Sequence, residues 1–153
     1  MARRIDRSSR IIAASPARIW RAMLTPGELL AWLPPRGMAG RIEAFEARVG
    51  GTYRMTLTHE AADPAGKSSG HTDIVQGRFV ELVEFRKVVQ AVEFPSEDPA
   101  FAGIMTITWS LAPVPIGTRV TIACENVPAG IGAQDHAAGM ASSLENLAHL
   151  LDG

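Results

Sequence analysis

The chain has 153 residues, which suits one domain with a single hydrophobic core, and we expect one domain over residues 1–153. Its apolar share of 46% and charged share of 20% are typical of a folded globular protein and exclude a disordered chain. The 15 basic and 16 acidic residues give a net charge of −1, which argues against nucleic acid as a partner.

Cysteine content and hydropathy restrict the compartment. The single cysteine, Cys124, excludes an intramolecular disulfide and a multi-cysteine zinc site, and it fits a reducing environment. No apolar run approaches the roughly 18 to 20 residues that cross a bilayer, and no apolar signal-peptide core follows the first arginines. We therefore expect a cytoplasmic protein without membrane insertion.

The start of the chain predicts a strand over residues 5–13. Its charged residues alternate with Ile5, which favours a solvated edge strand over a phosphate-binding patch. These residues are Arg3, Arg4, Asp6, Arg7 and Arg10.

Two short helices are predicted next. Ser15-Pro16 is a helix start, because serine caps free amides and proline is tolerated in the first turn. A second helix runs from Pro26 to about Trp32 and ends before Pro34-Pro35, which cannot continue it. We expect Trp20 to pack within the helices, while Trp32 is either a packing residue or part of a cavity mouth.

The polarity period then changes to two, which predicts strands over residues 39–48, 51–60, 71–82, 85–95, 102–112 and 118–127. Short turns join most of them, and the longest connection is a polar loop at residues 61–70. This arrangement favours an antiparallel sheet. Beyond residue 130 a helical stripe follows, formed by Ala137, Met140, Ala141, Leu144, Leu147, Ala148 and Leu151. This helix needs the sheet as a partner surface, because an isolated helix of its length is marginal in water.

The order of a strand, two helices, six strands and a long helix resembles the helix-grip fold of the START-like superfamily, also called SRPBCC. This resemblance implies an α+β fold, with a curved seven-stranded antiparallel sheet wrapped around a long C-terminal helix. Several segments are similar to the family named after the activator of Hsp90 ATPase homologue 1. They are residues 15–35, 50–55, 77–82, 105–109 and 117–122. The resemblance implies a hydrophobic cavity. The superfamily includes lipid carriers, polyketide cyclase-like proteins and hydrolases, so the resemblance does not select one activity.

Strand alternation indicates which side chains face that cavity. Tyr53, Met55 and Leu57 oppose a polar set, and Met105 and Trp109 do likewise on a later strand. An ordinary packed core remains the alternative for most of these positions. The predicted ligand-binding residues are Trp32, Tyr53, Met55, His59, Met105, Trp109, Met140 and Leu144.

Three functions follow as hypotheses. The first is non-catalytic binding of a hydrophobic or amphipathic small molecule between the sheet and the C-terminal helix. The second is an enzyme that cyclises, dehydrates or hydrolyses a hydrophobic substrate, with His59 as base and Tyr53 as proton donor or orienting group; Asp73 could pair with His59 in such a site. The third, implied by the family name, is an Hsp90-associated interaction module. The sequence leaves the ligand open.

Other chemistry lacks support in the sequence. The four histidines show no metal-ligand spacing, so we expect no metal, and Gly130-Ile131-Gly132 lacks the third glycine of a phosphate-binding turn, so we expect no cofactor. Glu43 and Glu46, three apart on a predicted strand, should point to opposite faces and make a poor acid–base pair. The oligomeric state stays open; a homodimer would pair sheet edges, with Met38 or Leu33 in the contact.

Overall fold

The computed structural model describes residues 4–34, 37–59, 72–94 and 98–152, so the predicted loop at 61–70 lies outside the described residues. Its strands are β1 (Ile5–Ile12), β2 (Met38–Phe45), β3 (Thr52–His59), β4 (Thr72–Val83), β5 (Lys87–Glu93), β6 (Met105–Val114) and β7 (Gly117–Glu125). Its helices are α1 (Pro16–Leu24), α2 (Pro26–Trp32) and α3 (Ala133–Asp152), with a 3-10 turn at Pro99–Phe101. Each predicted strand and helix is present, and the boundaries differ by a few residues.

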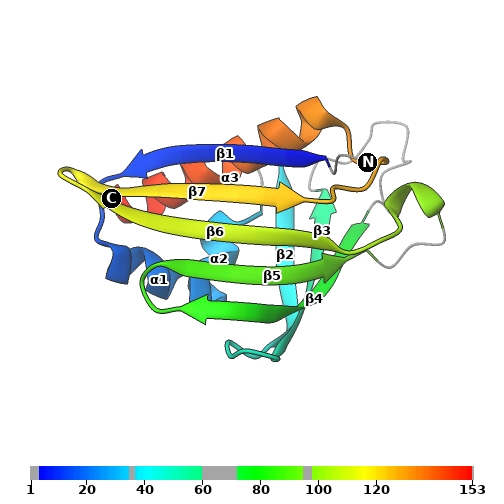
Figure 1. Cartoon of the computed structure of the whole chain (residues 1–153), viewed down its shortest axis with the longest axis horizontal. Helices are drawn as coiled ribbons and strands as arrows, with labels where there is room; N and C mark the ends of the chain where they lie inside the picture. The colour runs from blue at the N-terminus through cyan, green and yellow to red at the C-terminus, as the bar shows by residue number, and fades with distance from the viewer. Residues whose placement is uncertain (1–3, 35–36, 60–71, 95–97, 153) are drawn as a thin grey trace.

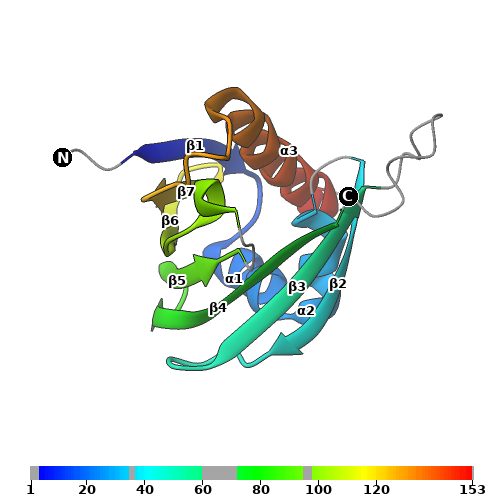
Figure 2. The ribbon, with the colours of Figure 1, turned by 90° about the vertical axis from the view of Figure 1, so that its right-hand side faces the viewer.

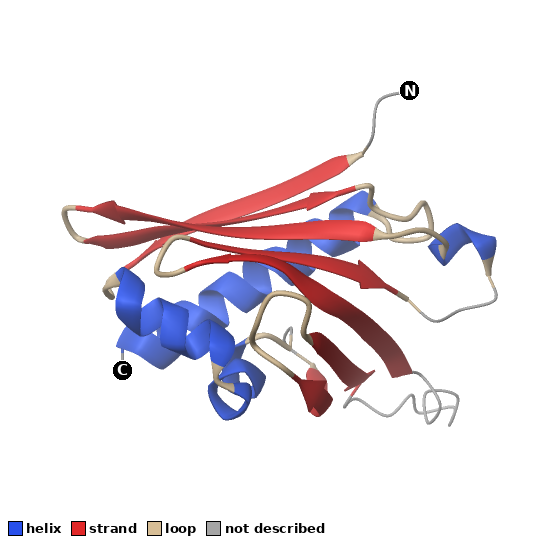
Figure 3. Ribbon diagram, turned by 60° about the horizontal axis from the view of Figure 1, so that its bottom comes forward, coloured by secondary structure: helices blue, strands red, loops and turns tan. Residues whose placement is uncertain are grey.

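The seven strands form one antiparallel sheet in the order β1-β7-β6-β5-β4-β3-β2 (Figure 1). The sheet curls, so that β2 and β3 turn across the direction of β5 and β6 (Figure 2). All three α-helices lie on its concave side (Figure 3). This is the helix-grip architecture that the order of elements predicts.

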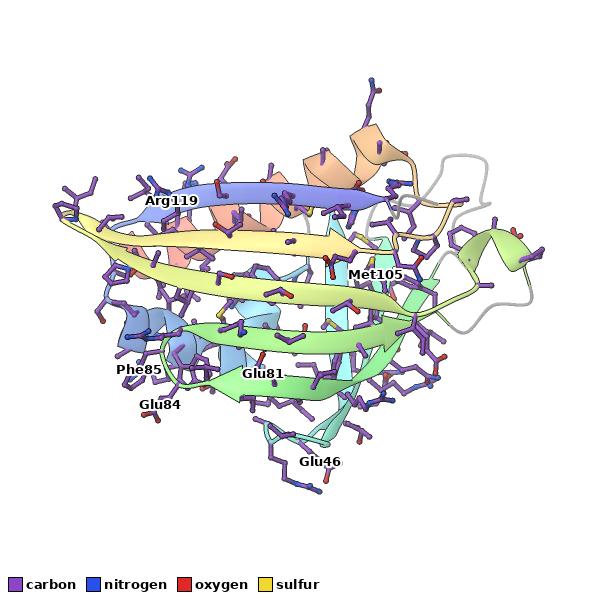
Figure 4. The ribbon with its side chains drawn as sticks, in the orientation of Figure 1. Glu46, Glu81, Glu84, Phe85, Met105 and Arg119 are labelled. Carbon is purple, nitrogen blue, oxygen red and sulfur yellow. The ribbon has the colours of Figure 1, made fainter. Side chains whose placement is uncertain are left out.

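The two short helices begin as the sequence predicts. The Ser15 hydroxyl accepts a hydrogen bond from the Arg18 backbone amide at 3.2 Å and caps α1, with Pro16 in the first turn. Trp20 contacts the ring of Phe85 edge to face, with centroids 6.2 Å apart. Phe85 lies in the β4–β5 turn, at the opposite end of the sheet from Met105 (Figure 4). Trp20 therefore packs between α1 and this turn.

Helix α3 packs along β1 and touches the end of α2. The predicted apolar stripe is correct for Met140, Leu144, Leu147 and Ala148, which are all buried. It is wrong for Ala137 and Ala141, which are exposed. Ser143 takes a buried place instead, so the inward face of α3 is rotated relative to the predicted one.

The glycine pair before β3 makes a turn that favours glycine at both positions, by backbone conformation at Gly50 and by lack of space at Gly51. Gly50 has φ of +83°, a conformation that glycine adopts without cost, and a Cβ on Gly51 would lie 2.1 Å from the carbonyl oxygen of Glu46. The turn also extends the sheet, because the Gly50 amide donates to the Phe79 carbonyl at 2.8 Å and the Phe79 amide donates to the Gly51 carbonyl at 2.9 Å. The pair thus fixes where β3 begins.

A bulge at Glu43 overturns one predicted orientation. The register between β2 and β3 shifts between Ile42 and Ala44, so strict alternation stops there. Glu43 accepts a hydrogen bond from Thr56 Oγ1 at 2.9 Å, and Glu46 accepts one from Thr52 Oγ1 at 2.8 Å. Both threonines lie on the outer face of β3, so the two carboxylates share that face instead of pointing to opposite ones.

We expect Gly51→Ala to lower the free energy of unfolding by about 1 to 3 kcal/mol, because the added methyl group has no space beside Glu46. Gly27→Ala is the matched control, since nothing lies within 4 Å of the position that its added methyl group would take and α2 gains a better helix former. Urea unfolding of both variants measures the difference. Equal stability of the two variants would contradict the assigned turn.

Candidate functional site

A cavity of about 220 Å³ lies between the concave face of the sheet and α3, and it is partly open to solvent. Its apolar wall includes Met23, Leu29, Trp32, Leu33, Phe45, Tyr53, Met55, Leu57, Val75, Val88, Phe94, Met105, Ile107, Trp109, Ile122 and Met140. Gln90, Cys124, His136 and Ser143 add polar atoms, and Gly139 of α3 leaves space beside them. An apolar pocket with a few polar groups is the usual character of a small-molecule site.

Trp32 forms part of the inner wall of this cavity. Its side chain is only 1% exposed, and its ring meets Trp109 edge to face with centroids 5.4 Å apart. Its indole Nε1 donates to the Ala22 carbonyl at 2.9 Å. Trp32 is therefore a buried wall residue and not part of an exposed mouth.

The turn after Trp32 is the docking point of α3. Ser143 Oγ donates to the Leu33 carbonyl at 2.6 Å. Asn146 Nδ2 donates to the carbonyls of Trp32 and Pro34 at 3.2 and 3.1 Å. The last carbonyls of a helix have no partner within it, and these side chains supply one. The proline-stiffened segment thus joins α2 to α3 along the cavity wall.

The predicted ligand-binding residues are distributed unevenly around the cavity. Six line it, namely Trp32, Tyr53, Met55, Met105, Trp109 and Met140. Leu144 is 1% exposed but lies outside the lining, among the other buried residues of the core. His59 ends β3 opposite Met38, and its side chain, like that of Asp73, lies outside the described part.

Burial changes the acidity of two groups in the wall. The Tyr53 side chain is 6% exposed, and burial raises the pKa of its hydroxyl above the ordinary range, with the nearby Cys124 adding to the effect. Burial, together with the negative charge of Asp6, raises the pKa of Cys124 to about 12. Both groups are neutral at pH 7, and Cys124 is the inert buried thiol that alternation predicts.

A hydrogen-bonded polar group beside the cavity joins the start of the chain to the first turn of α3. Asp6 of β1 accepts two hydrogen bonds from Arg4, at 3.1 Å from Nε and 2.8 Å from a terminal nitrogen. The second Asp6 oxygen also lies 2.7 Å from Nδ1 of His136, in the first turn of α3. The hydrogen bonds from Arg4, and then that from His136, lower the pKa of Asp6 although burial opposes them.

Sequence reasoning missed this group, because it assigns the charged residues around Asp6 to a solvated face. Of the neighbouring isoleucines, Ile5 and Ile11 are 44% and 43% exposed, whereas Ile12 is 1% exposed. Asp6 shares the parity of Ile12, so its side chain lies on the inward face of β1. The signal was an acidic residue on the same face of the strand as this buried isoleucine.

The size of the cavity limits what it holds. An engineered apolar cavity of about 150 Å³ binds benzene, so 220 Å³ accepts a somewhat larger compact guest.

Within the described residues, no three His, Cys, Asp or Glu side chains gather as metal ligands, and no helix is both long and apolar enough to cross a membrane.

Comparison with known proteins agrees with this architecture. A model of the family described as activator of Hsp90 ATPase homolog 1-like protein matches residues 13–152. The chain belongs to that family. None of the curated proteins compared with the chain matches it.

Several solved structures are similar to this member of the activator of Hsp90 ATPase homolog 1-like family. Protein CV1439 from Chromobacterium violaceum is 32% identical with a TM-score of 0.86, and the match covers 97% of both chains. A Rhodobacter sphaeroides protein is 25% identical with a TM-score of 0.76, over 95% of this chain and 91% of the other. DynU16, from the dynemicin biosynthetic locus, is 17% identical with a TM-score of 0.69, over 97% of this chain and 47% of its own, and shows the fold alone.

We expect Cys124 to react with a thiol reagent about 1000-fold more slowly in the folded protein than in the unfolded one at pH 8. The reason is that burial raises its pKa to about 12, which leaves little thiolate at that pH. Because the chain has one cysteine, labelling in water and in denaturant compares the same group. Similar rates in both conditions would show that the thiol is accessible.

We expect acid to destabilise the wild type more steeply than Asp6→Asn. The pKa of Asp6 is lower in the folded state, so its stabilisation is present above the unfolded pKa, near 4, and disappears as the pH falls through the folded value. Urea unfolding between about pH 6 and pH 3 measures this loss. Arg4→Met, which removes the main cause of the shift, should also flatten the dependence; unchanged slopes in both variants would contradict the assignment.

Proposed function

We propose that the protein binds a compact hydrophobic or amphipathic small molecule in the cavity between the sheet and α3, without covalent chemistry. The cavity of about 220 Å³, walled by apolar side chains and partly open to solvent, is the observation that supports this function. Filling such a space removes apolar surface from water, which contributes a favourable free energy of roughly 25 cal/mol per Å² of buried apolar surface. The guest therefore gains affinity from shape and apolar area.

The polar groups of the wall favour an amphipathic guest over a hydrocarbon. His136 and Gln90 are half-buried at the cavity, so an apolar guest pressed against them would displace water without replacing its hydrogen bonds. Tyr53 and Cys124 are neutral, so they place no charge beside the guest at pH 7.

The three tryptophans give a direct test of occupancy. Trp32 and Trp109 line the cavity, whereas Trp20 packs on Phe85 outside the lining. In the variant Trp20→Phe, emission comes from the two cavity residues alone. We titrate this variant with toluene, naphthalene, 2-naphthol and octanoate and follow its tryptophan emission. We also measure its melting temperature, which rises with bound ligand.

We expect Val75→Phe to weaken binding of these probes at least tenfold, because Val75 lines the cavity and a phenyl ring would occupy part of it. Val83→Phe is the matched control, since it makes the same change at an exposed position of the same strand. Isothermal titration of both variants gives the comparison. If no probe shifts the emission or melting temperature of Trp20→Phe, or if both valine variants bind alike, the proposal is wrong.

A further inference from the structure

We propose that His136 is the polar recognition group of this cavity, and that it selects guests carrying a hydroxyl group on a compact apolar body, such as small phenols. The inference rests on the proposed binding function and names the class of ligand. Two features of His136 support it: the imidazole lies in the cavity wall, and Asp6 bonds one of its two ring nitrogens and leaves the other for a guest.

His136 enters the cavity wall from the first turn of α3. Its backbone amide bonds the Gly132 carbonyl at 2.9 Å, so its position is set by the start of the helix. Its side chain is 17% exposed and shares the lining with Gly139 and Met140 of the same helix. Figure 1 shows that β1, β6 and α3 all begin at this end of the molecule. The ring thus stands where the helix meets the edge of the sheet.

Asp6 fixes which nitrogen of the ring is free. Nδ1 lies 2.7 Å from the Asp6 carboxylate, which Arg4 holds with two further bonds. An ionised carboxylate only accepts, so Nδ1 carries the proton that it shares with Asp6. Nε2, on the other side of the ring, points away from Asp6, and it has no hydrogen-bond partner among the described residues.

Arg4 anchors this arrangement to the segment that precedes α3. One of its terminal nitrogens donates to the Ile131 carbonyl at 2.5 Å while the others hold Asp6. The guanidinium therefore ties β1 to the loop before the helix and orients the carboxylate at the same time. Asp6 and Arg4 are positioning residues, since they act on a guest only through His136.

A hydroxyl group is the partner that suits Nε2. It can donate to a neutral Nε2 or accept from a protonated one, so it is matched in either state of the ring. A hydrocarbon in the same place would cover the nitrogen and leave it without water or a partner. Neighbouring Cys124, Ile107 and Met140 bring no charge to the lining, so the aromatic or alicyclic body of the guest faces a neutral surface.

The experiment compares p-cresol with p-xylene, which differ by a hydroxyl in place of a methyl group. Isothermal titration gives the ratio of the two dissociation constants for the full chain and for His136→Phe, which keeps a planar ring without nitrogen. The two compounds differ in their free energy of transfer from water, and this difference affects the ratio equally in both proteins. Comparing the two ratios therefore isolates the contribution of His136. We expect the preference for p-cresol to fall about tenfold in His136→Phe, with p-xylene binding retained.

His149→Phe is the matched control. It makes the same substitution on the same helix, at a side chain that is 74% exposed and outside the cavity lining. We expect its ratio to equal that of the wild type. Asp6→Asn, which weakens the orientation of the ring, should lower the ratio to an intermediate value without changing p-xylene binding.

A second measurement avoids substitution. In the wild type, the ¹⁵N chemical shift of His136 Nε2 should move on addition of p-cresol and stay within a small fraction of that change on addition of p-xylene. Binding of both compounds with an unchanged ratio in His136→Phe and no selective shift would overturn this inference alone. Failure of both compounds to bind the wild type would overturn the proposed function with it. Tighter binding of 4-methylbenzoate than p-cresol, lost in His136→Phe, would replace the hydroxyl with an anionic group and overturn the stated class.

Discussion

The contact between Trp32 and Trp109 is the constraint on which the cavity depends. It joins the end of α2 to the middle of the sheet, with ring centroids 5.4 Å apart. The carbonyls at the end of α2 also accept hydrogen bonds from Ser143 and Asn146, so this segment contacts α3 as well as the sheet. Sheet, short helix and long helix therefore meet at one point, and the space beyond it remains unfilled. Pro34 suits this segment because proline has no backbone N–H to continue α2, which leaves carbonyls at the end of the helix free for partners.

Empty volume beside a single helix needs small residues on that helix and curvature in the sheet. Gly139 and Ser143 are the small residues on α3, in place of Ala137 and Ala141 of the predicted stripe. Register shifts near Glu43 and Val80 interrupt the ladders, and such bulges bend strands. Gly77 also lets β4 and β5 approach closely, since a Cβ there would lie 2.1 Å from the Ala91 carbonyl oxygen. The hollow is thus a product of the backbone as much as of its lining.

The fold followed from the sequence because its signals are local and agree with each other. Alternation assigned Tyr53, Met105 and Trp109 to the inner face, and the cap at Ser15 set the first helix. The group formed by Asp6 and His136 did not follow, since its members are 130 positions apart and join only when α3 lies against β1. Local periodicity also erred where a bulge reset it at Glu43 and where the inward face of α3 had to be chosen. Contacts of this kind need the tertiary arrangement.

The two outer strands of the sheet bear on how the protein avoids aggregation. A free strand edge is a template for further strands, and inward charges and bulges make it a poor one. Strand β1 carries inward Asp6 and exposed Arg7 and Arg10, while β2 is interrupted at Glu43. The salt bridge between Arg4 and Asp6 therefore has a second consequence, because it places charge at the start of an outer strand, which disfavours the addition of a further strand there.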